Sequence, residues 1–323
     1  MKVEPVVYAA LTSFALVMVA GPLAIPALRR LRMGQVVREQ GPSRHLAKAG
    51  TPTMGGLLFV GACVVSAVWF APRTATLWVG LGVIAAFAAI GFADDFAKVA
   101  RRRSLGLRAR TKLVGQAVAG FALYAVAAER GLGTWVEVPW FAYVFDLGPW
   151  YPLFVVVVLI ASANAVNLTD GLDGLAAGST VIALAFYLLV ALERGQAELA
   201  VISGALAAGT AAFLFFNAHP AQIIMGDTGS MALGAALGVL AVLTKTELLL
   251  PVVGGLFVIE ALSVIVQVGY FRLTGGRRLL KMSPLHHHFE LSGWSEQRVV
   301  SAFWALSALF AALGLISLRS PGG

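Results

Sequence analysis

Residues 76–98 read TLWVGLGVIAAFAAIGFADDFAK, an apolar stretch that ends in two adjacent aspartates and a lysine. Its first part, 76–93, has no charged side chain, and a helix of about 20 residues is long enough to cross the ~30 Å hydrocarbon core of a bilayer. The stretch therefore predicts a membrane-spanning helix. A carboxylate at the bilayer centre costs about 2.5–3.5 kcal/mol on insertion scales, so Asp94 and Asp95 are expected at the membrane surface or in a wet cavity.

Comparable apolar runs recur along all 323 residues, of which 59% are hydrophobic and only 12% charged. This composition excludes an ordinary soluble protein and predicts an all-α integral membrane protein with about ten transmembrane helices in a single domain, 1–323. The expected spans are 6–28, 53–71, 76–93, 113–128, 151–168, 174–192, 199–216, 229–244, 249–271 and 299–318. Segment 131–150 is expected to be a loop that carries interfacial tryptophans.

The basic residues group in alternate connecting segments. Of the 24 lysines and arginines, 18 fall in 29–48, 98–112 and 272–298. Short positively charged loops stay in the cytoplasm, so these segments are predicted to be cytoplasmic and both termini to lie on the outer side, periplasmic or extracellular. The net charge of +8 follows from this topology, and no basic patch interleaved with aromatic residues indicates nucleic-acid binding.

Five of the six aspartates occur at the predicted cytoplasmic ends of apolar runs. They are Asp94, Asp95, Asp170, Asp173 and Asp227. The negative charge of so many carboxylates on one face has to be neutralised by cations. Basic residues neutralise part of it, and Mg²⁺ or Mn²⁺ would do so more specifically. Adjacent residues on a helix point about 100° apart, so Asp94 and Asp95 are expected to divide roles. One would face the metal or substrate, and the other would pair with a basic residue.

The stretch NAVNLTDGLDG (164–174) continues this polar pattern. Asn164, Asn167 and Asp170 recur every three residues and therefore cover one arc of a helix. We expect this arc to line a cavity at the membrane surface. Hydrogen bonding between helices is the alternative role for the two asparagines.

Two glycine-containing stretches, GTPTMGG (50–56) and GDTGS (226–230), have two possible roles. Backbone N–H groups at a junction between a loop and a helix bind anions well. Glycines also permit close packing of membrane helices. Neither stretch is a P-loop, because the pattern GxxxxGK[ST] is absent.

Three of the five histidines are consecutive in KMSPLHHHFE (281–290). Consecutive side chains on a helix diverge, so His286, His287 and His288 are not expected to converge on one metal, and Mg²⁺ prefers oxygen to imidazole. Near basic residues, imidazoles are better suited to donating hydrogen bonds to phosphate oxygens. The alternative for one of the three is packing or bracing of the loop.

Five motifs resemble those of a known family in order and spacing. They are AGTPTMGG (49–56), ADDFAK (93–98), NAVNLTDGLDGLAAG (164–178), FNAHPAQIIMGDTGS (216–230) and MSPLHHHFE (282–290). The family is the phospho-N-acetylmuramoyl-pentapeptide transferases (MraY, translocase I), a branch of the polyprenyl-phosphate N-acetylhexosamine-1-phosphate transferase superfamily. The aspartate motifs alone indicate the superfamily, whereas HHHFE is the more specific signal for this branch.

The resemblance implies a Mg²⁺-dependent transfer of phospho-MurNAc-pentapeptide from UDP-MurNAc-pentapeptide to undecaprenyl phosphate. The products would be lipid I and UMP, in peptidoglycan synthesis at the bacterial inner membrane. The catalytic residues implied are Asp94, Asp95, Asp227 and His286, with Asp227 as the metal ligand. The substrate-binding residues expected are Lys48, Thr53, Lys98, Asn164, Asn167, Asp170, Asn217, His287 and His288. Membrane lipid is a further partner, and a homodimer is left open.

The sequence departs from the family pattern at Ala47, Leu105 and Ala302, where basic residues are frequent, and at Ile224, where phenylalanine often lies near the uracil.

Two other functions are possible for these motifs. A related transferase using UDP-GlcNAc would share the aspartates without needing HHHFE. A transporter would place its charged residues near the bilayer midplane. For the reaction path, direct attack by the lipid phosphate, with Asp94 as the base and His286 on phosphate, is favoured over a covalent aspartate intermediate.

Overall fold

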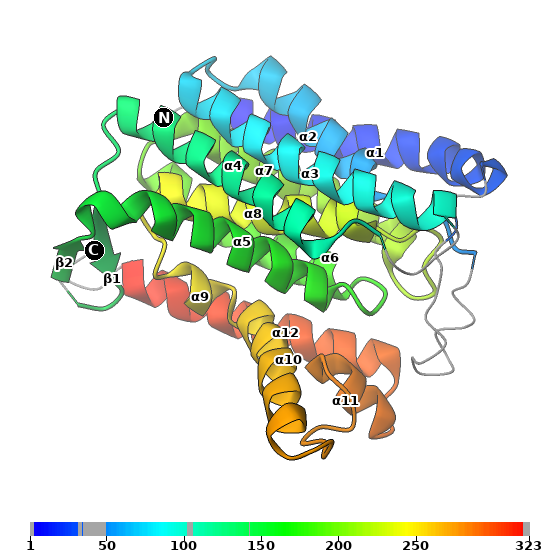
Figure 1. Ribbon diagram of the computed structural model, residues 1–323. Helices are drawn as coiled ribbons and strands as arrows, with labels where there is room; N and C mark the ends of the chain where they lie inside the picture. The colour runs from blue at the N-terminus through cyan, green and yellow to red at the C-terminus, as the bar shows by residue number, and fades with distance from the viewer. Residues whose placement is uncertain (1–2, 32–33, 35–49, 102–105, 142, 319–323) are drawn as a thin grey trace.

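The computed structural model describes residues 3–31, 34, 50–101, 106–141 and 143–318. These residues form a bundle of helices with one small β-hairpin at one end (Figure 1). The helices are α1 (Glu4–Arg30), α2 (Gly56–Phe70), α3 (Ala75–Arg101), α4 (Ala109–Glu129), α5 (Tyr151–Thr169), α6 (Leu175–Glu193), α7 (Ala197–Asn217), α8 (Gly226–Leu243), α9 (Leu250–Val253), α10 (Gly255–Leu273), α11 (Leu285–Leu291) and α12 (Glu296–Leu318). The hairpin is β1 (Trp135–Val138) and β2 (Tyr143–Asp146), followed by the 3-10 turn η2 (Gly148–Trp150).

Each expected span coincides with a helix or a pair of helices. Within the described ranges, nine helices are long and apolar enough to cross a membrane, and α2, with 15 residues, is shorter. The run 249–271 is not one helix, because α9 ends at Val253 and α10 begins at Gly255. The protein is therefore a multi-pass helical membrane protein, as the sequence predicts.

The segment 131–150, expected as a loop, contains the hairpin. Its strands pair antiparallel over four residues each, beginning with Trp135 opposite Asp146. The strand sequences WVEV and YVFD consist largely of valine and aromatic residues, which favour strands. The all-α prediction therefore holds for the bundle and misses this small sheet.

The start of α1 and the end of α12 lie at the same end of the bundle, which is the end that carries the hairpin (Figure 1). The backbone N–H of Trp140, between the two strands, donates to Ser317 Oγ on α12 at 3.1 Å. Having both ends together agrees with an even number of spans. That this end faces outward is a prediction from the basic residues alone.

The core of the bundle is α8, which packs against α2, α3, α5 and α6. In the apolar stretch of α8, 89% of the residues are buried, compared with 22% in that of α10, which extends away from the bundle at the bottom of Figure 1. Small residues permit this packing. A Cβ on Gly234 would lie 2.5 Å from Cα of Ala163 on α5, and a Cβ on Gly56 would lie 2.2 Å from Cα of Gly229. Lipid is as apolar as leucine, so no hydrophobic effect drives membrane helices together, and they associate through such close packing contacts instead.

Gly91 fixes the distance between α3 and the first turn of α8. A Cβ at this position would lie 2.2 Å from the backbone carbonyl oxygen of Asp227. We expect Gly91→Ala to lower the free energy of unfolding by about 1–3 kcal/mol, because relieving the overlap requires a backbone shift. Gly82→Ala on the same helix is the matched control, since an added Cβ there meets nothing within 4 Å. Unfolding in detergent measures both variants, and equal stability would contradict the prediction.

Candidate active site

Three carboxylates gather at the end of the bundle opposite the hairpin. Asp94 and Asp95 lie near the end of α3 and Asp227 in the first turn of α8, with one oxygen of each within 4.8 Å of the others. Lys98 Nζ lies 2.7 Å from Asp94 and 3.1 Å from Asp227. Lys112 Nζ, near the start of α4, donates to Asp227 Oδ2 at 2.7 Å. Three of the aspartates predicted to share a face therefore meet, together with two lysines.

The second of these lysines, Lys112, was not predicted as a site residue, because in the sequence it stands out only as one of the basic residues of 98–112. Its Nζ lies 3.4 Å from Asp94 Oδ1 as well as against Asp227. One signal was available in the sequence. Lys112 directly precedes the apolar run 113–128. The start of this run and the end of the run 76–93 are at the same membrane surface, so Lys112 is expected at the surface where Asp94 and Asp95 lie.

The two adjacent aspartates of α3 have different partners. Asp94 is buried, and its Oδ1 accepts the backbone N–H of Leu107 at 2.8 Å, besides contacting the lysines. Asp95 is also buried, but it accepts hydrogen bonds from the first turn of α8, including the backbone N–H of Asp227 at 3.1 Å. The pairing of one aspartate with basic residues is therefore observed, for Asp94. Asp95 bonds to a helix end instead, and contact of either aspartate with a metal or substrate stays a prediction.

Asp227 has the most accessible carboxylate of the three. Its side chain is 16% exposed, compared with 3% for Asp94 and 4% for Asp95. Three carboxylates facing two ammonium groups leave an excess of negative charge. Hard oxygen donors of this kind fit Mg²⁺, which binds through one or two carboxylates and leaves its other positions to water and phosphate. The donor set therefore fits the metal, with Asp227 as the most available ligand.

The two glycine-containing stretches lie against each other. The backbone N–H of Ile224 donates to the carbonyl of Pro52 at 2.8 Å, and the N–H of Gly55 donates to the carbonyl of Ile224 at 2.9 Å. Thr53 is buried beside the start of α8, where a Cβ on Gly226 would lie 2.7 Å from Thr53 Oγ1. Close packing, one of the two roles considered for these glycines, is therefore present.

The asparagines of α5 bond to neighbouring helices. Asn164 Nδ2 donates to Gln116 Oε1 on α4 at 3.2 Å, and Asn167 Nδ2 donates to Ser230 Oγ on α8 at 2.8 Å. Asp170 follows at the C-terminal cap of α5. The alternative role of the asparagines, hydrogen bonding between helices, is therefore observed, and their contact with substrate stays a prediction.

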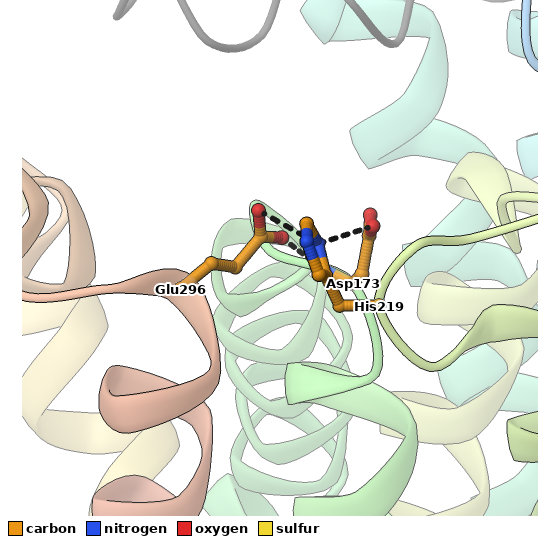
Figure 2. A group of neighbouring side chains, drawn as sticks. All are labelled: Asp173, His219 and Glu296. Atoms are coloured by element: carbon orange, nitrogen blue, oxygen red, sulfur yellow. Dashed lines mark hydrogen bonds and ion pairs between the residues drawn. The ribbon is translucent and has the colours of Figure 1, made fainter.

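A second polar cluster joins three elements. Figure 2 shows Asp173, His219 and Glu296 pointing toward one another from the turn after α5, the loop after α7 and the first turn of α12. His219 Nδ1 lies 3.3 Å from an oxygen of each acid. Next to them, Asn217 Oδ1 accepts the N–H of Gly174 at 3.1 Å. This cluster holds the loop that leads into α8. Neither His219 nor Glu296 was predicted as a site residue.

The three consecutive histidines each have a different partner, as their spacing predicts. His286 is fully buried, with Nδ1 3.2 Å from Glu260 Oε2 on α10. His287 Nδ1 lies 2.9 Å from Glu290 Oε2. His288 Nδ1 accepts the backbone N–H of Lys281 at 3.1 Å, so this imidazole braces its own loop. Contact of the histidines with phosphate stays a prediction.

Three positions singled out in the sequence lie outside the described residues. They are Lys48, expected in the nucleotide-sugar pocket, and Ala47 and Leu105, where the chain departs from the family pattern. Of the other predicted site residues, Thr53, Lys98 and Asn167 lie against the first turns of α8, and the three histidines lie on α11, where His286 is next to Glu260 of α10.

Known proteins give independent evidence. The model of glycosyl transferase family 4 matches residues 77–245, and signature 1 of phospho-N-acetylmuramoyl-pentapeptide-transferase matches residues 48–60. A protein of that name from Moorella thermoacetica is 52% identical over 316 residues, with 98% of both chains covered. Those from Desulforamulus reducens and Geobacillus kaustophilus are 51% and 47% identical, with at least 94% of each chain covered.

Proposed function

Because the chain belongs to the phospho-N-acetylmuramoyl-pentapeptide-transferase family, we propose that it transfers phospho-MurNAc-pentapeptide from UDP-MurNAc-pentapeptide to undecaprenyl phosphate. The products are lipid I, a peptidoglycan precursor, and UMP. The observation that carries this proposal is identity of about half of all positions over nearly the full length of both chains. The enzyme would act at the cytoplasmic face of the bacterial inner membrane, where an aqueous nucleotide sugar and a lipid phosphate meet.

The reaction is a direct displacement in this proposal. An oxygen of the lipid phosphate attacks the phosphorus attached to the sugar, the bond from that phosphorus to the oxygen shared with the uridine phosphate breaks, and UMP leaves. Lys98 and Lys112, which lie against the three aspartates, would offset the charge of the phosphates, which is the main requirement of phosphoryl transfer. Asp94 is the proposed proton acceptor, although a phosphate with a second pKa near 6 needs little proton removal at neutral pH.

Asp227 is the proposed ligand for Mg²⁺, supported by its exposure and by the excess of carboxylates around it. When bound, the metal would neutralise charge on phosphate oxygens and orient the substrate. With both its oxygens next to lysines, Asp227 is better placed to share cations than to act as a nucleophile. This favours the direct path over a covalent aspartate intermediate.

Purified protein with undecaprenyl phosphate and Mg²⁺ tests the proposal when UMP and glycolipid are assayed. We expect product with UDP-MurNAc-pentapeptide and none with UDP-GlcNAc. Without lipid, labelled UDP-MurNAc-pentapeptide should give neither a stoichiometric burst of UMP nor label retained on denatured protein. Product from UDP-GlcNAc instead would select the wider superfamily activity. A burst without lipid would establish the two-step path.

A further inference from the structure

We propose that Asp95 is a positioning residue that caps α8 from the neighbouring helix and thereby holds the Asp227 carboxylate in place, with Thr228 completing the cap. This inference rests on the proposed function, in which Asp227 binds the metal. It separates the two adjacent aspartates, because Asp94 contacts the lysines of the site whereas Asp95 acts through α8.

The cap satisfies donors that α8 cannot satisfy by itself. The first N–H groups of a helix lack partners within the helix and are normally satisfied by the side chain of the preceding residue. In α8 that residue is Met225, which forms no such bond. Instead, Asp95 Oδ1 accepts the N–H of Asp227 at 3.1 Å, and Oδ2 accepts the N–H of Thr228 at 2.9 Å. The Thr228 hydroxyl also donates to Oδ2, at 2.7 Å, which is the third hydrogen bond to this carboxylate.

Two glycines allow Asp95 to come this close. Gly226 has a φ of +70°, a conformation that favours glycine, and a Cβ on it would lie 2.4 Å from Asp95 Oδ2. Gly91, one turn before Asp95 on α3, leaves no room for a Cβ against the Asp227 backbone. The contact between the two helices is therefore arranged around the Asp95 carboxylate.

Both oxygens of Asp95 are engaged by α8, and its side chain is only 4% exposed. Lys98 Nζ approaches its Oδ1 no closer than 3.8 Å, compared with 3.1 Å for Asp227. A metal bound by Asp95 would share the oxygens that accept hydrogen bonds from the helix carrying Asp227. Asp95 therefore affects the metal through the position of Asp227. Partners that orient a metal ligand commonly change metal affinity or activity 10–100-fold when they are removed.

Mn²⁺ is a suitable probe, because it shares the preference of Mg²⁺ for oxygen ligands and its affinity is measured by electron paramagnetic resonance without turnover. We expect Thr228→Val in the full chain to weaken Mn²⁺ binding about tenfold and Asp95→Asn about 10–100-fold, because a carboxamide offers an N–H group where an acceptor is needed. The double variant should bind no more weakly than Asp95→Asn alone, because the hydroxyl acts through this carboxylate. Thr228→Ser keeps the hydroxyl and should restore the affinity.

Thr210→Val on α7 is the matched control. Within the described part of the chain, the buried Thr210 hydroxyl has no hydrogen-bond partner, so its loss should leave Mn²⁺ affinity unchanged. Wild-type affinity in Thr228→Val would overturn the positioning role, and it decides the question even when Asp95→Asn does not fold. Mn²⁺ affinity that survives Asp227→Asn would overturn the metal assignment of the proposed function, and this inference with it. The two failures are thus distinguishable.

Discussion

Asp227→Asn should lower turnover about a hundredfold or more, which corresponds to ~2.7 kcal/mol of lost transition-state stabilisation. The substitution replaces a charged oxygen donor with a neutral one at the most exposed carboxylate of the site. A carboxamide binds a hard divalent cation more weakly than a carboxylate does. The Mg²⁺ concentration for half-maximal activity should therefore rise at the same time. UMP release over a Mg²⁺ titration measures both effects.

The matched control for this variant is Asp146→Asn at the other end of the bundle. Asp146 is exposed, and its hydrogen bonds among the described residues stay in its own hairpin region, for example the one from the N–H of Gly148 at 2.9 Å. Its turnover should stay within about twofold of wild type, as is usual for surface substitutions. Melting curves of both proteins establish that they are folded. Wild-type turnover and Mg²⁺ dependence in Asp227→Asn would remove Asp227 from the metal site.

Lys112→Met should lower turnover about 10–100-fold while lowering, not raising, the Mg²⁺ concentration needed for half-maximal activity. Lys112 Nζ lies between Asp227 and Asp94, at 2.7 Å and 3.4 Å. Removing this positive charge makes the site more negative and therefore favours binding of a cation. Two unit charges 4 Å apart near a protein surface interact by about 4 kcal/mol, so the effect on Mg²⁺ binding should be measurable. The substitution also removes a group that offsets phosphate charge in the transition state, and single groups of that kind contribute 10²–10³-fold elsewhere.

The opposite signs separate this prediction from the one for Asp227. A site that merely became distorted would lose turnover and metal affinity together. Lys112→Arg is the conservative variant, because it keeps the charge and should retain more activity than Lys112→Met, although a planar guanidinium does not reproduce a compact ammonium. A raised Mg²⁺ requirement in Lys112→Met would show that the lysine supports the metal site instead of competing with the cation.

The membrane spans are the part of the fold that the sequence determines. A helix in lipid satisfies its backbone hydrogen bonds within its own segment, so length and apolar composition suffice to locate it. The runs 76–93 and 229–244 are found in this way, as α3 and α8. Features that do not follow from length and apolar composition are harder to predict from the sequence. The break at Gly254 and the hairpin at 135–146 both escaped prediction.

The chemistry of the site could also be located from the sequence, but the roles of its members could not. Asp94, Asp95 and Asp227 were placed on one face because charged side chains avoid the bilayer centre. Nothing in the adjacent letters of ADDFAK indicates that one aspartate contacts lysines and the other caps a different helix. That distinction depends on the rotation of α3 against α8, which close contacts such as that of Gly91 set.

The sequence by itself determined that this is a multi-pass membrane enzyme of one family and that Asp94, Asp95 and Asp227 collect at one end. Only the tertiary structure decided which helix is central and which partners the polar residues have, including Lys112 with Asp227 and His286 with Glu260. The physical reason is that apolar helices in lipid are nearly equivalent in hydrophobicity, so their neighbours are selected by the fit of small residues and a few hydrogen bonds between segments far apart in the chain.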